Sequence, residues 1–270
     1  GAKALTATAG PGHILMQDPL AMAEAVRLPM VTVVMQRGGP STGTVVYGQQ
    51  EVSMACFGGN GEGLRVVYSI ANPQEAYSYM IKSFKTAWKY RFPTFVLGDG
   101  YVAKMKQLVK LHISRTQIKS EKILGKFGKV VNMRNCYNIE SQLADVLKKD
   151  IEDFNKISKK IVESETFQCR NASILLVAHG IVSQAAREAV EILRKHGQKV
   201  GLFRPITLNP FDYATLSRLA ANSKKMIILE SSTGHFERIV KQKLYGSTKI
   251  ETYQKPVEPI SVEEIVELIK

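Results

Sequence analysis

The sequence is poor in cysteine and has no long apolar run, and each shortage excludes a class of protein. Its three cysteines form no CxxC pair, which argues against a zinc ribbon or an iron–sulfur cluster held by this chain alone. A sparse, odd number of cysteines is typical of a reducing compartment, and no signal peptide is recognisable. Apolar runs such as residues 174–178 are far shorter than the roughly 20 residues of a membrane span. We therefore expect a cytoplasmic protein that does not enter a membrane.

Common signatures of nucleotide, metal and hydrolase sites are missing as well. The segment after Gly10 is not a GxGxxG fingerprint, and the chain has neither a Walker A loop nor a GxSxG elbow. No histidine forms an HxxxH pair or stands at metal-ligand spacing from a cysteine. The histidines are His13, His112, His179, His196 and His235. We expect no metal site in this chain and a structural role for the histidine that follows residues 174–178.

Positive charge is abundant and unevenly distributed. The formal net charge is +13, and residues 104–129 carry eight lysines and arginines against one glutamate. We favour a solvated linker here, ahead of a docking surface for an acidic partner or a phosphate-bearing ligand. Nucleic-acid binding is disfavoured because the only aromatic residue of this stretch is Phe127, which leaves no platform for stacking bases.

The remaining pattern is that of a globular α/β protein. Strand-like and helix-like segments alternate in the first hundred residues and again in the last hundred, which is typical of parallel sheets covered by helices. The expected strands are residues 2–9, 30–36, 65–69, 94–98, 173–178, 199–204, 226–229 and 249–253. The expected helices are residues 13–26, 72–90, 183–196, 213–222, 236–245 and 262–269. Ser261 and Glu264 form a capping box at the start of the last helix.

This alternation predicts two three-layer α/β domains. The first covers residues 1–102 and the second residues 170–270. Residues 103–169 join them as a basic linker followed by an amphipathic helix. The chain opens directly with residues 2–9, which read as a buried strand. We therefore expect the first domain to be incomplete at its start.

Residues 37–43 (RGGPSTG) are the most informative stretch. They follow an expected strand, and open α/β sheets bind ligands beyond the carboxyl ends of their strands. Glycines let the backbone approach a ligand closely, and Arg37 can hold a carboxylate through two parallel hydrogen bonds. Ser41 and Thr42 add hydroxyl donors. We favour this ligand site over the alternative, a tight turn with a surface arginine.

Two other glycine-containing segments are less specific. Residues 6–12 (TATAGPG) follow a strand and open a helix, whose N-terminus attracts anionic and polar groups. An ordinary strand-to-helix turn is an equally good interpretation. Residues 58–63 contain Asn60 and Glu62 but no second carboxylate at a useful spacing, so a plain loop is favoured there.

Taken together, these segments occur in one family of enzymes. The matching segments are residues 4–12 (ALTATAGPG), 36–43 (QRGGPSTG), 57–63 (FGGNGEG), 178–180 (AHG) and 201–211 (GLFRPITLNPF). In this order, and over nearly the whole chain, the sequence resembles the α subunit of the 2-oxoacid:ferredoxin oxidoreductases. The first two segments, residues 4–12 and 36–43, are together the specific part of the resemblance.

The resemblance implies a pyrimidine-binding domain of a thiamine diphosphate enzyme, followed by a domain similar to the C-terminal domain of transketolase. A separate β subunit would hold the diphosphate, Mg²⁺ and an iron–sulfur cluster. Further γ and δ subunits and an α–α dimer fit the same assembly. The implied reaction is oxidative decarboxylation of a 2-oxoacid to acyl-CoA and CO₂, with coenzyme A as co-substrate and ferredoxin as electron acceptor.

The resemblance also assigns site residues. Arg37 would bind the substrate carboxylate, with Ser41 and Thr42 beside it. The pyrimidine side of the cofactor would be lined by Thr8, Gly10, Pro11 and Gly12. The glutamate that activates the cofactor in this family lies upstream of residues 6–12, before Gly1, so no catalytic acid is assigned here.

Residues in three segments depart from the family's pattern. Residues 44–46 are Thr-Val-Val where many relatives have Leu-Pro-Thr, Asn60 stands where histidine is common, and His235 stands where glutamine is common. An apolar Val46 near the substrate favours branched or aromatic 2-oxoacids over 2-oxoglutarate.

Two other functions compete with this one. A non-catalytic scaffold subunit of such a complex would share the motifs, and a full-length chain without the activating glutamate would favour it. A basic nucleotide- or nucleic-acid-binding α/β module would use residues 104–129 and bind in a salt-dependent way.

Overall fold

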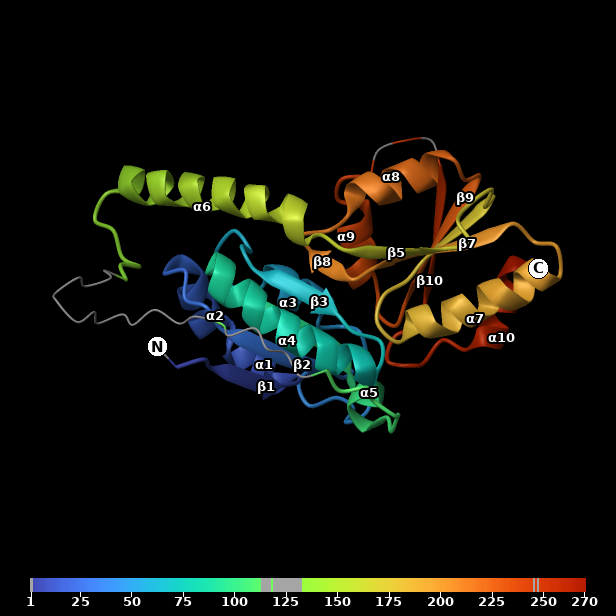
Figure 1. Ribbon diagram of the computed structural model, residues 1–270, viewed down its shortest axis with the longest axis horizontal. Coiled ribbons are helices and arrows are strands. Elements are labelled where there is room, and N and C mark those ends of the chain that lie inside the picture. Colours follow the sequence, from blue (N-terminus) through green and yellow to red (C-terminus); the bar gives the residue numbers. More distant parts are fainter. Residues whose placement is uncertain (1, 113–117, 119–132, 245, 247) are drawn as a thin grey trace.

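The computed structural model describes residues 2–112, 118, 133–244, 246 and 248–270. Within them, two five-stranded sheets lie in neighbouring domains, each covered by helices (Figure 1). The chain builds most of the first domain, drawn from blue to green, before it enters the second, drawn from yellow to red. The predicted class, two three-layer α/β domains, is confirmed. None of the described helices is long and apolar enough to cross a membrane.

The first sheet has four parallel strands and one antiparallel strand at its edge. In spatial order they are β1 (Leu5–Thr8), β2 (Val31–Gln36), β4 (Thr94–Asp99), β3 (Val66–Ser69) and β8 (Thr207–Asn209). Thr94 pairs with Val31 on one side and Val66 on the other, so the central strands start level. Their carboxyl ends therefore share one edge of the sheet.

Alternating side chains of the central strands bury both faces of this sheet. Val34 belongs to a core cluster formed with α2 (Gln17–Ala25) and α3 (Val52–Phe57). Val33, its neighbour in β2, packs instead against α4 (Pro73–Tyr90). Two short helices, α1 and α5, follow β1 and β4 directly; they are Pro11–Leu15 and Gly100–Lys104.

Helix α4 begins where the sequence predicts a cap. The side chain of Asn72 accepts a hydrogen bond from the backbone N–H of Glu75 at 2.9 Å, and Pro73 occupies the first turn. The carboxylate of Glu75 accepts the N–H of Ala71 at 2.8 Å. The helix ends at Tyr90, and the next residue, Arg91, has a left-handed φ of 55°.

The connection between the domains contains one long helix, α6 (Glu140–Ile161). Phe154 packs edge-on against Phe92 of the first domain, with ring centroids 5.2 Å apart. Asp150 accepts a hydrogen bond from Arg27 at 2.7 Å. The helix is thus anchored to the first domain. Much of the basic stretch at residues 104–129 lies outside the described residues.

The second sheet repeats the arrangement. Its spatial order is β10 (Lys249–Gln254), β9 (Lys225–Glu230), β6 (Ile174–Val177), β7 (Val200–Pro205) and β5 (Ser164–Phe167), of which β5 is antiparallel. Helices α7 and α10 cover one face and α8 and α9 the other. Their bounds are Val182–Lys195, Val262–Ile269, Tyr213–Ala221 and His235–Lys241. The predicted capping box of α10 is present.

Three details differ from the sequence-based expectations. The periodicity of residues 13–26 is interrupted at Met16, where α1 ends and α2 begins. The strand expected over residues 2–9 is not buried: it lies at the edge of the sheet, and Leu5 is 53% exposed. The short strands β5 and β8 were not predicted, because three or four residues carry too little periodicity and their partners lie far away in the chain.

Candidate functional site

The carboxyl edge of the first sheet brings the two motif loops together. Gly10 follows β1 with a left-handed φ of 55°, and Arg37 follows the adjacent strand β2. A Cβ atom on Gly10 would lie 2.7 Å from Nε of Arg37 and 3.3 Å from the backbone oxygen of Ser41. Only glycine therefore allows the Arg37 side chain to lie against this turn.

The other residues assigned to the cofactor side form the same turn. A Cβ atom on Gly12 would lie 2.1 Å from Oγ1 of Thr8, so the backbone at Gly12 also approaches a neighbour closely. Pro11 occupies the first turn of α1, where its missing N–H is not needed. Thr8, Gly10, Pro11 and Gly12 thus build one compact corner beside Arg37.

The loop after Arg37 is closed by short hydrogen bonds. The backbone N–H of Thr44 donates to the oxygen of Gly38 at 2.7 Å, and the N–H of Gly38 donates to Oγ1 of Thr44 at 3.1 Å. Ser41 and Thr42 stand at the exposed tip of this loop. The structure therefore brings the backbone of Ser41 close to Gly10 but leaves both hydroxyl side chains at the surface.

The Arg37 guanidinium forms no ion pair with a carboxylate within the part of the chain that the structure describes. Its Nε is buried and makes no hydrogen bond, although an unsatisfied buried donor costs on the order of 1–3 kcal/mol. A carboxylate ligand offers acceptor oxygens in the geometry that a guanidinium prefers. The donor set at this corner therefore fits a carboxylate ligand.

Glu51 is a residue of this edge that sequence reasoning missed. Its Oε1 accepts hydrogen bonds from the N–H of Gly10 at 3.0 Å and from Nδ1 of His13 at 2.9 Å. Its Oε2 faces the N–H of Arg37 at 3.3 Å. The available signal was weak: an acidic residue directly before the apolar helix α3.

Loops of the second domain meet this edge. The hydroxyl of Tyr47 lies 2.7 Å from Oγ of Ser231, which follows β9. The N–H of Gln49 donates to the oxygen of Ser231 at 3.2 Å, and its side-chain oxygen accepts the N–H of Ser231 at 3.3 Å. Burial raises the pKa of Tyr47 well above its ordinary value. The loop that begins at Arg37 is thereby fixed between the two domains.

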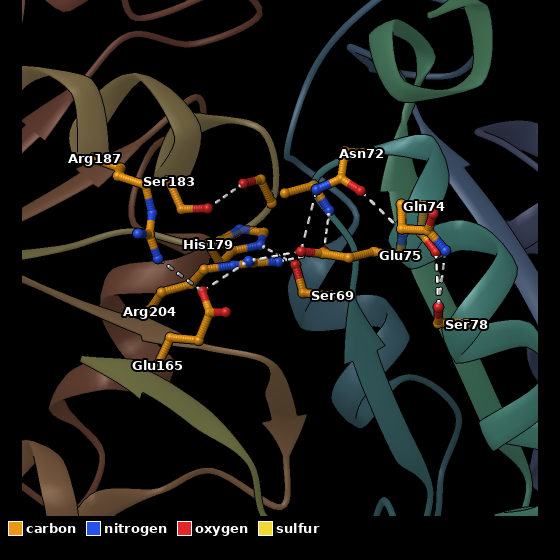
Figure 2. A network of polar contacts seen from close by, with 12 residues as sticks. Ser69, Asn72, Gln74, Glu75, Ser78, Glu165, His179, Ser183, Arg187 and Arg204 are labelled. Atoms are coloured by element: carbon orange, nitrogen blue, oxygen red, sulfur yellow. Dashed lines mark hydrogen bonds and ion pairs between the residues drawn. The ribbon is translucent and has the colours of Figure 1, made fainter. Parts of the chain in front are cut away.

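A second polar contact between the domains surrounds Arg204 of β7 (Figure 2). Its Nη1 donates to Glu75 at 2.9 Å and to Glu165 at 3.0 Å. Beside it, Nδ1 of His179 lies 3.0 Å from Oγ of Ser69. Figure 2 shows these side chains pointing toward one another from strands and helices of both domains. This cluster joins the domains, and its charges balance because Arg187 lies 3.6 Å from Glu165.

Two buried groups near these contacts have shifted pKa values. Burial raises the pKa of Asp99 to about 6, although its Oδ1 accepts the N–H groups of Tyr101 and Val102 at 3.0 Å each. Burial, together with the nearby Arg204 charge, lowers the pKa of His179 to about 3. The imidazole of His179 is therefore neutral near neutral pH, in agreement with a structural role.

The glycine-rich loop at residues 58–63 lies away from this site. It precedes β3, so it belongs to the amino edge of the first sheet, opposite Arg37. Arg65 fixes it by donating to the oxygen of Gly58 at 2.7 Å and to Glu24 at 3.2 Å. The structure thus separates Glu62 from the motif loops. Among the described residues, no group of histidine, cysteine and acidic side chains could hold a metal ion.

Comparison with known proteins gives the same assignment as the motifs. Residues 1–154 match the family of pyruvate flavodoxin/ferredoxin oxidoreductases, thiamine diphosphate-binding domain, and residues 172–261 match the pyruvate:ferredoxin oxidoreductase core domain II. The chain therefore belongs to the thiamine diphosphate-dependent oxidoreductases that act on 2-oxoacids with ferredoxin. Within them, it is an α subunit of the 2-oxoacid:ferredoxin oxidoreductase family, as its relatives show.

Two curated relatives have named substrates. The chain is 33% identical over 275 residues to 2-oxoglutarate synthase subunit KorA of Methanocaldococcus jannaschii, which covers 90% of this chain and 74% of the relative. It is 29% identical over 250 residues to ketoisovalerate oxidoreductase subunit VorB of Methanothermobacter marburgensis, which covers 89% and 70%. The family predicted from the motifs is confirmed.

Solved structures support the fold. A 2-oxoglutarate:ferredoxin oxidoreductase from Magnetococcus marinus, solved with 2-oxoglutarate, coenzyme A and succinyl-CoA bound, superposes with a TM-score of 0.85 at 23% identity. The match covers all of this chain and 53% of that one, so the chain spans about half the length of this neighbour. A split-gene transketolase matches with a TM-score of 0.55 at 10% identity and covers 98% and 74%.

Proposed function

We propose that this chain is the α subunit of an enzyme that oxidatively decarboxylates a 2-oxoacid to an acyl-CoA and passes the electrons to ferredoxin. The observation that carries the proposal is the Arg37 guanidinium, which lies against the Gly10 turn with a buried, unsatisfied Nε. In this family the substrate and the cofactor must meet at one edge of the sheet, and this corner lies at such an edge.

Each residue of the corner has a role in this proposal. Arg37 binds the substrate carboxylate and sets the direction of the 2-oxo group. Thr8 and the turn from Gly10 to Gly12 line the pyrimidine side of thiamine diphosphate, since the two glycines place no side chain between the backbone and a ligand. Ser41 and Thr42, at the loop tip, remain candidates for contacts with the acid. When bound, the cofactor supplies the carbon nucleophile and the electron sink for decarboxylation.

Further components complete the proposal. A β subunit holds the diphosphate with Mg²⁺ and the iron–sulfur cluster, and coenzyme A accepts the acyl group. Ferredoxin receives the electrons, with γ and δ subunits and an α–α dimer as further parts of a cytoplasmic complex. The three free cysteines of this chain, of which Cys56 is buried, agree with a cluster carried by another subunit.

For the substrate we favour a branched or aromatic 2-oxoacid. Val46 is half-buried in the segment that follows the Arg37 loop, and in this proposal its apolar side chain lines the part of the site that receives the side chain of the acid. Relatives named for 2-oxoglutarate and for ketoisovalerate have similar identity to this chain, so the relatives alone do not discriminate between the two acids.

The test is an assay of the complex co-purified with its β subunit. Coenzyme A-dependent reduction of a viologen dye is measured with a panel of acidic, branched and aromatic 2-oxoacids. We expect turnover, with the highest kcat/KM for a branched or aromatic acid. Absence of turnover with every acid, despite bound thiamine diphosphate and an intact cluster, would contradict the proposal and favour a scaffold subunit.

A further inference from the structure

Glu51 is the side chain that connects both motif loops. It is 5% exposed, and its carboxylate lies between the N–H of Gly10 after β1 and the N–H of Arg37 after β2. His13, fully buried in α1, donates from Nδ1 to the same carboxylate oxygen as Gly10. One carboxylate thus holds the start of the cofactor turn and the backbone of the substrate arginine.

The position of Glu51 is itself determined by the centre of the sheet. Its N–H donates to Oε1 of Gln36 at 3.2 Å, and the side-chain amide of Gln36 donates to the oxygen of Gly98 in β4 at 3.2 Å. Hydrogen bonds to an ionised acceptor are stronger than neutral ones, and the site is nearly closed to water. The carboxylate therefore couples three neighbouring strands at their carboxyl ends.

We propose that Glu51 is a positioning residue for the 2-oxoacid site: it aligns the Arg37 guanidinium with the Gly10 turn so that both face one ligand. This inference rests on the proposed function. Glu51 touches neither substrate nor cofactor in this role. It acts through the backbone of Arg37, and a small displacement there moves the guanidinium, since catalytic geometry tolerates about half an ångström of error.

The decisive variant is Glu51→Gln, which keeps the shape of the side chain and replaces one acceptor oxygen with a donor. Its remaining oxygen can still accept from Gly10 and His13, but its amide would then face the N–H of Arg37. In the complex with the β subunit, we expect KM for the 2-oxoacid to rise about tenfold or more, with kcat reduced less than threefold. The dissociation constant of thiamine diphosphate, measured by calorimetry, should rise only a few-fold.

The matched control is Glu24→Gln. Glu24 is equally buried, at 6% exposed, and accepts from Arg65 at the opposite edge of the sheet. This variant should lower the melting temperature and leave KM within twofold of wild type. The contrast separates loss of a buried carboxylate from loss of alignment at the Arg37 corner.

The outcomes are distinguishable. If Glu51→Gln melts earlier but keeps KM within twofold, Glu51 only holds the fold and the inference is wrong. If that variant does not assemble, His13→Gln, which removes only the ring from the cluster, should raise KM about threefold, and an unchanged KM overturns the inference. If wild type turns over no acid, the proposed function fails, while calorimetric binding of a 2-oxoacid to wild type and to Glu51→Gln still decides whether Glu51 aligns the Arg37 corner: equal dissociation constants overturn the inference.

Discussion

Arg37 and Arg204 are both arginines at the carboxyl end of a parallel strand, yet their surroundings differ. Arg204 is 3% exposed and donates to Glu75 and Glu165. The guanidinium of Arg37 packs against Gly10 and forms no ion pair among the described residues, and Glu51 accepts from the backbone N–H of Arg37 rather than from its side chain. A paired guanidinium holds protein segments together, whereas an unpaired one is available to an anionic ligand. The neighbouring acids, not the arginine itself, separate a structural role from a binding role.

We expect the largest loss of stability from removing Arg204, the arginine with the structural role. Arg204→Met leaves Glu75 with a largely buried, unpaired charge, so we expect the free energy of unfolding to fall by about 3 kcal/mol. A urea titration of the chain measures this loss. KM for the 2-oxoacid should remain within twofold, and a large KM change without a loss of stability would reverse the roles of the two arginines.

The next largest effect is a rise in KM on removing Arg37, the arginine with the binding role. Arg37→Ala removes the ligand for the substrate carboxylate and should raise KM by about 30-fold, or about 2 kcal/mol. The free energy of unfolding should change little, because no protein carboxylate loses its partner. Arg37→Lys keeps the charge but loses the paired hydrogen bonds, so its KM should lie between the KM of wild type and that of Arg37→Ala. An unaltered KM in Arg37→Ala would refute the binding role.

Asp99 lies at the carboxyl edge of the first sheet and makes stability there depend on pH. Its pKa is raised to about 6 by burial, so the folded state keeps a proton between about pH 4 and pH 6 that the unfolded state releases. Stability should therefore fall by about 2 kcal/mol as the pH rises through this range, and level off above it. Asp99→Asn keeps an acceptor for the cap and should abolish this fall. Urea titrations at pH 4.5 and 7 compare the two proteins, and an identical pH dependence would contradict the shift.

On the Arg204 side, His179 makes stability depend on pH in the opposite direction. Its pKa is lowered to about 3, so the unfolded state gains a proton below about pH 6.5 that the folded state does not bind. Stability is then complete above pH 6.5 and is lost on acidification, by about 1 kcal/mol at pH 5.5. His179→Asn should remove this part of the acid sensitivity. Thermal unfolding of both proteins at pH 7.5 and pH 5.5 measures it.

Much of the fold could be predicted from the sequence because its elements are long and locally determined. Helix α4 has its cap at Asn72 and its proline at the first turn, and the predicted strands coincide closely with β2, β4, β6, β7 and β9. Strand β8 could not be predicted, because three residues acquire their strand conformation only by pairing with β3, about 140 residues earlier in the chain.

The candidate site was predictable in part for the same reason. Arg37 and Gly10 stand directly after strands, and the rule for open α/β sheets places both at one edge. Glu51 was not predictable, since its role depends on N–H groups of Gly10 and Arg37 that lie 41 and 14 residues away. The exposure of Ser41 and Thr42 could not be predicted from the sequence either, because it depends on how the loop closes at Thr44.

The amino-acid order is enough to give the alternation of strands and helices, the glycines that permit left-handed and close-packed turns, and the motifs that identify the family. These properties follow from local propensities and residue shape. Which charges meet depends on the folded arrangement of the two sheets: Arg204 lies between two glutamates, the Arg37 guanidinium pairs with none among the described residues, and Glu51 joins the loops after β1 and β2. Such contacts depend on the distance between residues remote in the chain, and that distance exists only once the sheets have formed.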